Sequence, residues 1–277
     1  MLQRVDFIAY SLAYCLARMH RKIRPNNIAK LSVIIITKNE ENAIGDCLES
    51  VKWAHELIVV DSGSTDRTIE ICKSYGAIVS IEKDWPGFGK QKNRALNLAT
   101  NEWVLSIDAD ERVTPQLRDE ILNAISKPAT NVAFRIPRKS SLCGQFINHS
   151  GWWPDFVLRL FPRTDAKFSD DLVHERVLFN GKIKSLEEPF IHISHNDLDE
   201  VLNKSNRYSS DSAAMLLAKG QTSSLSKAIL HGVWAFIRTY FLRRGFLDGR
   251  IGLILAIATA ETTYYRYLKL MMMSLKK

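Results

Sequence analysis

The sequence predicts an α/β domain built on a mainly parallel sheet. Short apolar runs rich in β-branched residues alternate with segments of helical spacing, and polar clusters follow three of these runs. Continuous apolar runs of strand length are typical of strands buried on both faces. Strands that alternate with helices favour a parallel sheet covered by helices. The 277 residues allow one large domain, or one domain with an appendage.

The predicted elements follow one another from residue 31 onward. Strands are expected at 31–36, 57–60, 77–81, 103–107, 132–137 and 156–161. Helices are expected around 44–51, 69–72 and 90–99, and after Thr114-Pro115, which is typical of a helix start. Either Asn196 or Asp197 could cap a further helix, and two more helices are expected near 224–243 and 247–272. We therefore divide the chain into an amphipathic segment (1–30), an α/β domain (31–195) and a C-terminal helical region (196–277).

Three polar clusters stand where predicted strands end, at residues 37–40, 61–66 and 108–110. Ligands of such folds bind at the carboxyl ends of the strands. Asp108 and Asp110 are two apart on an extended chain, so their carboxylates point the same way. Paired carboxylates suit Mg²⁺ or Mn²⁺, although the tripeptide taken alone favours two solvated turn residues.

Charge is unevenly distributed along the chain, whose net charge is +8. Residues 1–30 hold six basic residues and one acid, residues 31–199 hold 20 and 25, and residues 200–277 hold 12 and four. The basic ends also contain apolar runs, 7–17 and 251–260, which are shorter than the about 20 residues of a membrane span. We therefore expect interfacial helices on an anionic membrane, and no nucleic-acid partner. A helix packed on the domain is the alternative for 7–17.

Three stretches together carry a family resemblance. They read LSVIIITKNEENAIGDCLESV, ELIVVDSGSTDRTIEI and GKQKNRALNLATNEWVLSIDADE. In order and spacing they resemble the family 2 glycosyltransferases, and more closely the bacterial enzymes that add glucose to the inner-core heptose of lipopolysaccharide or lipooligosaccharide. The resemblance is strong over 31–120 and continues through VHERV and GFLDGRIG. It implies a GT-A fold, a UDP-sugar donor, a divalent metal (Mg²⁺ or Mn²⁺) and inversion at the anomeric carbon.

The resemblance also implies roles for individual residues. Thr37, Asn39 and Glu40 would line the nucleotide pocket, Asp61 would hold the uracil or ribose, and Lys90 and Arg94 would approach the diphosphate. Asp108 would lie near ribose and metal, Asp110 would bind the metal directly, and His192 could complete the metal site, although a structural histidine fits equally well. These charges would neutralise the leaving nucleoside diphosphate.

Inversion also requires a base that takes the proton of the acceptor hydroxyl. Many family members carry an E-D pair for this purpose, whereas this chain has Asp170-Asp171 and His174-Glu175. The V-H-E sequence matches the closer family, so Glu175 is the preferred base, with Asp171 and Asp155 as alternatives. Trp152 and Trp153 could stack on an acceptor sugar, and packing in the core is the rival interpretation.

The sequence as a whole predicts a metal-dependent hexosyltransferase that acts on a lipid-linked saccharide. We expect it peripherally at the cytoplasmic face of the inner membrane, and its four cysteines, which lack C-x-x-C or zinc spacing, favour a reducing compartment. A polyprenyl-phosphate sugar synthase on the same fold is the enzymatic alternative. A non-enzymatic basic protein that binds membranes or nucleic acid is the other.

Overall fold

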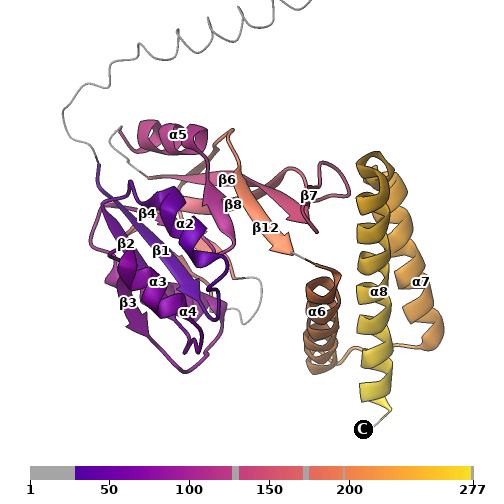
Figure 1. Cartoon of the computed structure of the whole chain (residues 1–277). Helices are drawn as coiled ribbons and strands as arrows, with labels where there is room; N and C mark the ends of the chain where they lie inside the picture. The colour runs from indigo at the N-terminus through magenta and orange to yellow at the C-terminus, as the bar shows by residue number, and fades with distance from the viewer. Residues whose placement is uncertain (1–28, 127–130, 171–174, 196, 276–277) are drawn as a thin grey trace, which may run out of the picture.

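The first half of the chain repeats strand and helix. The computed structural model describes residues 29–126, 131–170, 175–195 and 197–275. β1 pairs in parallel with β2 and β4, and β2 pairs in parallel with β3, which confirms the predicted α/β sheet (Figure 1). The elements are β1 (Leu31–Thr37), α2 (Ile44–Val51), β2 (Glu56–Asp61), α3 (Thr68–Ser74), β3 (Ile78–Ile81), α4 (Phe88–Leu98) and β4 (Trp103–Ser106).

The second half of the sheet is mixed. β8 pairs antiparallel with both β4 and β6, while β12 lies parallel to β6 and antiparallel to β5. In the described residues the strand order is β3-β2-β1-β4-β8-β6-β12-β5, with β7 and β11 also paired to β6. The further elements are β5 (Glu111–Val113), α5 (Pro115–Ile125), β6 (Val132–Leu142), β7 (Gln145–Phe146), β8 (Asp155–Pro162), β9 (Ala166–Phe168), β10 (Val177–Phe179), β11 (Lys182–Ser185) and β12 (Phe190–His195).

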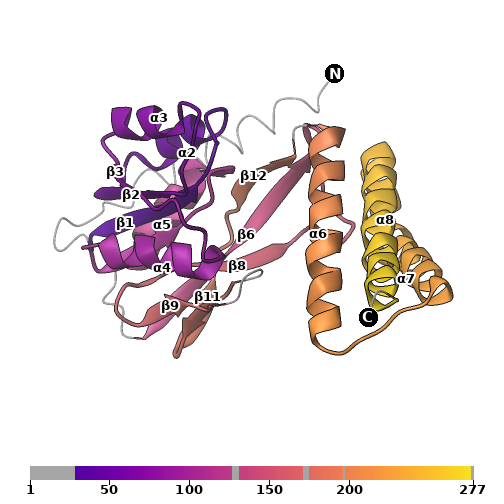
Figure 2. The same ribbon diagram turned by 90° about the horizontal axis from the view of Figure 1, so that it is seen from below.

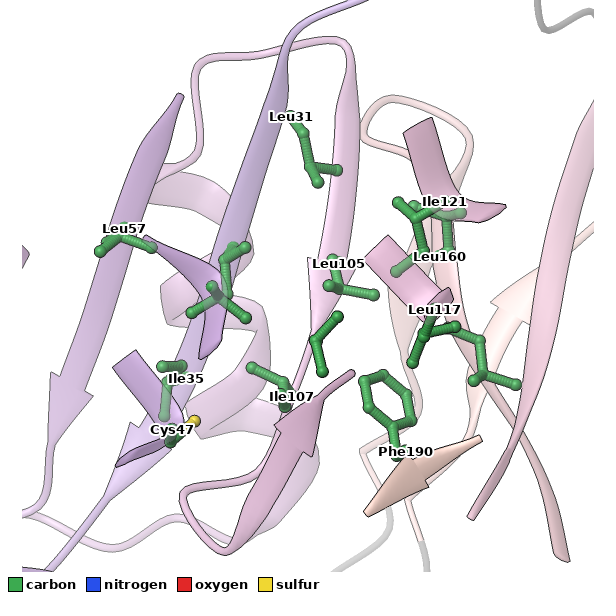
Figure 3. Packing of buried hydrophobic residues seen from close by; sticks show 14 of the residues in the cluster. Leu31, Ile35, Cys47, Leu57, Leu105, Ile107, Leu117, Ile121, Leu160 and Phe190 are labelled. Atoms are coloured by element: carbon green, nitrogen blue, oxygen red, sulfur yellow. The ribbon is translucent and has the colours of Figure 1, made fainter. Parts of the chain in front are cut away.

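The central strands are buried on both faces, as their continuous apolar sequence predicts. Because side chains alternate along a strand, Val33 and Ile35 of β1 pack in one cluster with residues of α2 and α5, while Ile34 packs in another with residues of α4. Figure 3 shows the first cluster, in which Leu117 and Phe190 lie close to the strands. The buried sheet provides the rigid frame from which the polar strand ends project.

Helix starts in the structure follow the capping chemistry of the sequence. Thr114 Oγ1 accepts a hydrogen bond from the backbone N–H of Leu117 at 3.1 Å, at the start of α5. Asp197 caps α6, since its carboxylate accepts from the N–H of Glu200 at 2.8 Å. Of the two predicted caps for that helix, the structure therefore uses Asp197.

The C-terminal helices form a layer beside the sheet. α6 (Leu198–Ala218) is followed by α7 (Leu225–Ile237), the π-helical turn η1 (Arg238–Leu242), the 3-10 turn η2 (Gly245–Asp248) and α8 (Gly249–Ser274). Figures 1 and 2 both show α8 between α6 and α7. No helix in the described part of the chain combines the length and apolarity needed to cross a bilayer. The predicted amphipathic segment at 7–17 lies outside the described residues.

Candidate functional site

The first two polar clusters are joined into one surface at the carboxyl ends of β1 and β2. Thr37 is paired with Asp61 across the two strands, and the N–H of Ser62 donates to the carbonyl oxygen of Thr37 at 2.9 Å. Asn39 accepts from the N–H of Thr65 at 2.8 Å through its side-chain oxygen. The N–H of Glu40 donates to Thr68 Oγ1 at 2.8 Å. The parallel register therefore brings together loops that are about 25 residues apart in the sequence.

Asp61 organises the turn that follows β2. The side chain is fully buried, and Oδ1 accepts hydrogen bonds from the N–H groups of Gly63 and Ser64, both at 2.8 Å. Ser64 Oγ donates to the other carboxylate oxygen. Gly63 has φ of 83°, which a residue with a side chain rarely adopts. The structure thus gives Asp61 a local role in shaping the loop beneath the expected nucleotide position.

Thr37 places a hydroxyl at the same strand end. Its Oγ1 is buried and has no hydrogen-bond partner within the described residues. Buried polar atoms are usually paired, so an unpaired hydroxyl at the carboxyl end of a central strand is available to a polar ligand. The role of Thr37 in a nucleotide pocket stays a prediction.

A buried ion-pair network, here called the Asp108 cluster, lies at the end of β4. It comprises Lys92, Asp108, Glu111, Arg159 and Glu175. Lys92 Nζ lies 2.9 Å from Asp108 Oδ1 and 2.7 Å from Glu175 Oε1, and its side chain is only 5% exposed. Arg159 binds Asp108 and lies 3.2 Å from Glu111 Oε1. The backbone N–H of Asp108 donates to Glu111 Oε2 at 3.0 Å, so Glu111 contacts both Arg159 and the backbone of Asp108.

Burial and charge act in opposite directions on the pKa values of this cluster. Burial favours the neutral form of Asp108, but Arg159 and Lys92 outweigh it and hold the pKa of Asp108 well below its usual range. Burial also raises the pKa of Glu111, and the charge of Asp108 adds to this effect. For Arg159, burial lowers the pKa, but Asp108 and Glu111 more than compensate and raise it. Asp108 is thus anionic and held between two cations.

Asp110 points to a different partner from Asp108. Its Oδ2 lies 3.3 Å from His192 Nε2, and His192 Nδ1 lies 2.8 Å from Ser140 Oγ. His192 on β12 is paired with Ser140 on β6 across the sheet. Burial, together with the charges of Asp110 and other acids, raises the pKa of Glu40 to about 7, which places Glu40 in the same electrostatic environment.

Asp110 and His192 could supply two of the ligands of a divalent metal. A carboxylate oxygen and an imidazole nitrogen are common ligands, and the Ser140 contact would fix the imidazole ring. Among the described residues, no three His, Cys, Asp or Glu side chains are gathered tightly enough to hold an ion by themselves. The remaining ligands would come from water and from the phosphates of the substrate, as is common where one or two carboxylates bind Mg²⁺.

The remaining predicted residues are placed in different surroundings. Lys90 is exposed on α4, and Arg94 forms an ion pair with Asp84 at 2.7 Å. Trp152 packs against the cluster formed by residues such as Ile147 and Leu255. Trp153 is partly exposed, and Asp155 is bound to Arg138, whose Nε donates at 2.9 Å. Asp171 lies outside the described residues, whereas Glu175 lies in the Asp108 cluster.

Three members of the cluster, Lys92, Glu111 and Arg159, were not among the site residues predicted from the sequence. Lys92 occupies the buried face of α4, where it shares helical spacing with Gly89, Ala95 and Leu96. A charged residue on the apolar face of an amphipathic helix was the available signal. Arg159 similarly interrupts the apolar run of β8. The helical period of α4 and the alternation of β8 therefore place Lys92 and Arg159 on the buried faces of these elements.

Gly89 allows α4 to approach the segment that contains Glu175. A Cβ atom at this position would lie 1.7 Å from the carbonyl oxygen of Ser169. Asn93 holds the same contact from one turn further along, because its side chain both donates to and accepts from the backbone of Phe168 at 2.9 Å. Close packing of α4 therefore brings Lys92 and Glu175 together although 83 residues separate them.

A cavity of about 500 Å³ lies at the opposite edge of the sheet. Lys30, His55 and Asn101 are among its lining residues, and they precede β1, β2 and β4 respectively. It is therefore at the amino ends of the parallel strands. Ligands of open α/β sheets bind at the carboxyl ends, so the polar strand ends remain the candidate site.

Comparison with known proteins supports a glycosyltransferase. A protein-family model described as "Glycosyl transferase family 2" matches residues 32–183. An uncharacterized glycosyltransferase of Rickettsia typhi is 35% identical over 259 residues, covering 89% of this chain and 88% of its own length. The lipopolysaccharide core biosynthesis glycosyltransferase LpsC of Rhizobium meliloti is 30% identical over 255 residues, covering 86% and 93%.

Solved structures show more distant similarity. Staphylococcus aureus TarS in complex with UDP gives a TM-score of 0.44 at 17% identity, covering 89% of this chain and 91% of that chain. Glucosyl-3-phosphoglycerate synthase of Mycobacterium tuberculosis, solved with Mn²⁺ and UDP, gives 0.33 at 26% identity over 38% of this chain and 43% of its own. The sequence matches extend over most of the chain and include the ordered strand-end motifs. The chain belongs to glycosyltransferase family 2.

Proposed function

We propose that this glycosyltransferase moves a hexose, with glucose as the first choice, from a UDP-sugar to a lipid-linked saccharide such as the lipopolysaccharide core. The observation that carries the proposal is the contact of Lys92 with both Asp108 and Glu175, beside the strand ends expected to hold the nucleotide. The similarity to LpsC over most of both chains supports the acceptor class.

The donor side of the site is argued from the strand ends. The proposal is supported by the unpaired hydroxyl of Thr37 and by the loops around Asn39 and Asp61, which meet at the carboxyl ends of β1 and β2. Lys92, rather than Lys90, is the cation of α4 that reaches the site. Its charge would stabilise the diphosphate that develops when the bond to the sugar breaks.

The transfer step needs one proton acceptor. The acceptor hydroxyl oxygen forms a bond to the anomeric carbon, the bond from that carbon to the diphosphate oxygen breaks, and the hydroxyl proton passes to a carboxylate. Glu175 fits this role because it is only partly exposed, and Lys92 fixes one of its oxygens at 2.7 Å. The electron pair of the broken bond leaves with the nucleoside diphosphate.

Asp110 and His192 are the residues that would hold a divalent metal. Such an ion supplies charge that stabilises the leaving diphosphate. Ser140 would orient His192 from the far side of its ring. Asp108 would act mainly in the ion-pair network, since its two oxygens are occupied by Lys92 and Arg159.

The C-terminal helices offer a surface that suits an anionic membrane. Six large apolar residues of α7 and η1 are each more than half exposed, and the exposed basic residues of the same segment include Arg238 and Arg244. Residues 225–260 contain five basic residues and one acid, Asp248, whose side chain is only 2% exposed. We call this surface the α7–η1 face; its five most exposed apolar residues are Leu230, Val233, Trp234, Phe241 and Leu242.

Exposed apolar side chains can insert into a lipid surface, and basic residues in the same segment are attracted to anionic lipids. We therefore propose peripheral attachment through the α7–η1 face to the cytoplasmic side of the inner membrane. A lipid-linked acceptor is confined to the same surface, so attachment would keep enzyme and acceptor together.

The test uses the full-length protein with UDP-glucose and three kinds of vesicle. One kind carries heptose-core lipopolysaccharide, one carries polyprenyl phosphate, and one carries neither. We expect sugar transfer to the heptose core and its loss in excess chelator. Glu175→Gln should lower that transfer by about 10²-fold or more, because a hydroxyl acceptor needs a base, while exposed Glu187→Gln serves as the matched control.

The outcomes separate the alternatives. Transfer to polyprenyl phosphate that is insensitive to Glu175→Gln would favour the polyprenyl-phosphate sugar synthase, since a phosphate acceptor needs no general base. Absence of both donor hydrolysis and transfer with any UDP-sugar would refute the donor assignment. Full activity in chelator would refute the metal.

A further inference from the structure

The loop after β7 is fastened to the C-terminal helices by one buried carboxylate. Asp248, the last residue of η2, accepts hydrogen bonds from the backbone N–H groups of Asn148 and His149, each at 3.0 Å. His149 Nδ1 lies 3.0 Å from Asp248 Oδ1, and Ser150 Oγ donates to Oδ2 at 3.1 Å. These four contacts, made around a side chain that is 2% exposed, are here called the Asp248 clasp.

Close backbone packing completes the clasp. The N–H of Ser150 donates to the carbonyl oxygen of Arg243 at 2.8 Å. A Cβ atom on Gly151 would lie 2.4 Å from the Arg243 side chain, and one on Gly245 would lie 2.8 Å from Ser150 Oγ. Residues 245–249 (GFLDG) and the loop are therefore closely packed, and a side chain at Gly151 or Gly245 would collide with the facing segment.

The clasped loop begins beside the candidate metal ligands. The N–H of Ile147 donates to the carbonyl oxygen of Ser140 at 3.0 Å. Ser140 is the residue whose Oγ lies 2.8 Å from His192. This first anchor belongs to the sheet, and the Asp248 clasp is the second anchor, at residues 148–150 immediately after Ile147.

The loop then leads to Trp152 and Trp153. The N–H of Trp152 donates to the carbonyl oxygen of His149 at 3.0 Å, and Trp152 packs against the apolar cluster that includes Leu255 of α8. Trp153 follows and is partly exposed. An aromatic ring of this kind can pack on the apolar face of a sugar. The loop thus lies between the site on the sheet and the helices that carry the α7–η1 face.

We infer that Asp248 is a positioning residue for the saccharide acceptor. It holds residues 148–153 in the conformation that presents Trp153 to the acceptor sugar, and it ties that conformation to the C-terminal helices. The inference rests on the proposed function, because it assumes that the acceptor is a saccharide. The donor site depends on the pairing of β6 with β12 and on the Asp108 cluster, so it does not require the clasp.

The experiment compares Asp248→Asn with Asp197→Asn in the full-length protein. Asp197 is also a carboxylate that accepts a backbone N–H, but at the start of α6, where asparagine caps equally well. The probe acceptor is heptose-core lipopolysaccharide in vesicles. We expect Asp248→Asn to raise the acceptor KM about tenfold or more, since an amide cannot accept from all four donors, with UDP affinity by calorimetry unchanged.

Hydrogen exchange at residues 148–150 provides a second readout. Amide protection there should fall in Asp248→Asn and remain normal in Asp197→Asn. Ser150→Ala removes only one hydroxyl donor and should raise the acceptor KM by a smaller factor, which keeps the test decisive even where Asp248→Asn does not fold. Trp153→Ala should raise the acceptor KM to a similar extent as Asp248→Asn.

The results distinguish this inference from the proposed function. A wild-type protein that transfers no sugar to a saccharide would refute both. The positioning role alone would be refuted if the wild type transfers sugar normally and a folded Asp248→Asn variant keeps the wild-type acceptor KM. If Asp248→Asn does not fold, an unchanged acceptor KM in Ser150→Ala would refute it instead. Equal loss of acceptor and UDP binding would show a general structural role and would also overturn the inference.

Discussion

The Asp108 cluster and the α7–η1 face differ in which groups they bury: the cluster buries charged groups, whereas the face exposes apolar ones. In the cluster, charged groups such as Lys92 and Arg159 are buried and paired at short distances. On the α7–η1 face, apolar groups such as Leu230 and Leu242 are exposed, and the same segment carries exposed basic residues. Both arrangements cost free energy in an isolated soluble chain, and each therefore indicates a function.

This difference indicates that the cluster serves the reaction and that the α7–η1 face serves binding. A preorganised set of buried charges can stabilise charge that develops in a reaction, whereas an exposed apolar surface gains free energy only when a partner covers it. The Asp248 clasp lies between these two regions. Variants should therefore separate chemistry, folding and membrane attachment.

The largest expected effect is on chemistry. Asp110→Ala should lower sugar transfer by about 10³-fold, because it removes a carboxylate that would hold the metal at the diphosphate. Stability in urea should change little, since the Asp110 side chain is 31% exposed and its contact is with His192. Asp119→Ala on α5, where the carboxylate is 64% exposed, is the matched control. An Asp110→Ala variant with normal activity would remove the metal from the mechanism.

The next effect is on folding. Lys92→Met should lower the free energy of unfolding by about 3 kcal/mol, because it removes the buried cation that pairs with Asp108 and Glu175, whose side chains are 30% and 17% exposed. Lys90→Met, two residues earlier on the exposed face of α4, should change it by less than about 0.5 kcal/mol. Urea denaturation monitored by circular dichroism measures both. Equal stability of the two variants would show that the cluster is not the paired core described above.

A smaller effect should be confined to the membrane. Replacing Phe241 and Leu242 with serine should weaken binding to anionic vesicles by about 2–3 kcal/mol while leaving hydrolysis of the donor intact. Ile78→Ser and Ile81→Ser on the edge strand β3 are the control, because these side chains are also about half exposed (50% and 47%).

Salt sharpens the same measurement. High salt should release part of the wild-type protein from the vesicles, since it screens the basic residues but not apolar insertion. A wild-type protein that stays in solution with anionic vesicles at low salt would refute the attachment. The α7–η1 face would then need a different partner.

The smallest effect concerns Glu40 and pH. The pKa of Glu40 is raised from 4.5 to about 7, so the folded state holds its proton more tightly than the unfolded state does. The resulting stabilisation is complete below pH 4.5 and is lost as pH rises through about 7. Relative to wild type, Glu40→Gln should therefore gain about 1 kcal/mol between pH 5 and pH 8, a value reduced for the partial exposure of the group.

The Glu40 measurement needs urea midpoints at both pH values. Glu102→Gln, at an exposed position, is the control and should show no such pH dependence. Mg²⁺ should diminish the difference if it binds at Asp110, because a cation there favours ionised Glu40. A Glu40→Gln variant whose advantage is the same at pH 5 and pH 8 would contradict the raised pKa.

Much of the fold could be predicted because it depends on local periodicity. The β-branched runs of β1 and β2, the helical spacing of α2 and the cap at Thr114 were all readable from neighbours in the chain. The order of the three polar clusters was readable too, since parallel strands place their carboxyl ends at one edge. The antiparallel insertion of β8 between β4 and β6 was not, because strand pairing depends on distant partners.

The site divides in the same way. The sequence by itself determined the family motifs, the residues at the strand ends and the basic, apolar character of the C-terminal region. Only the tertiary structure decided that Lys92 rather than Lys90 faces Asp108, and that Asp108 and Asp110 have separate partners. It also placed Asp248 beneath a loop about 100 residues away. The physical reason is that periodicity fixes the face on which a side chain lies, while the partner on that face is set by packing between elements remote in sequence.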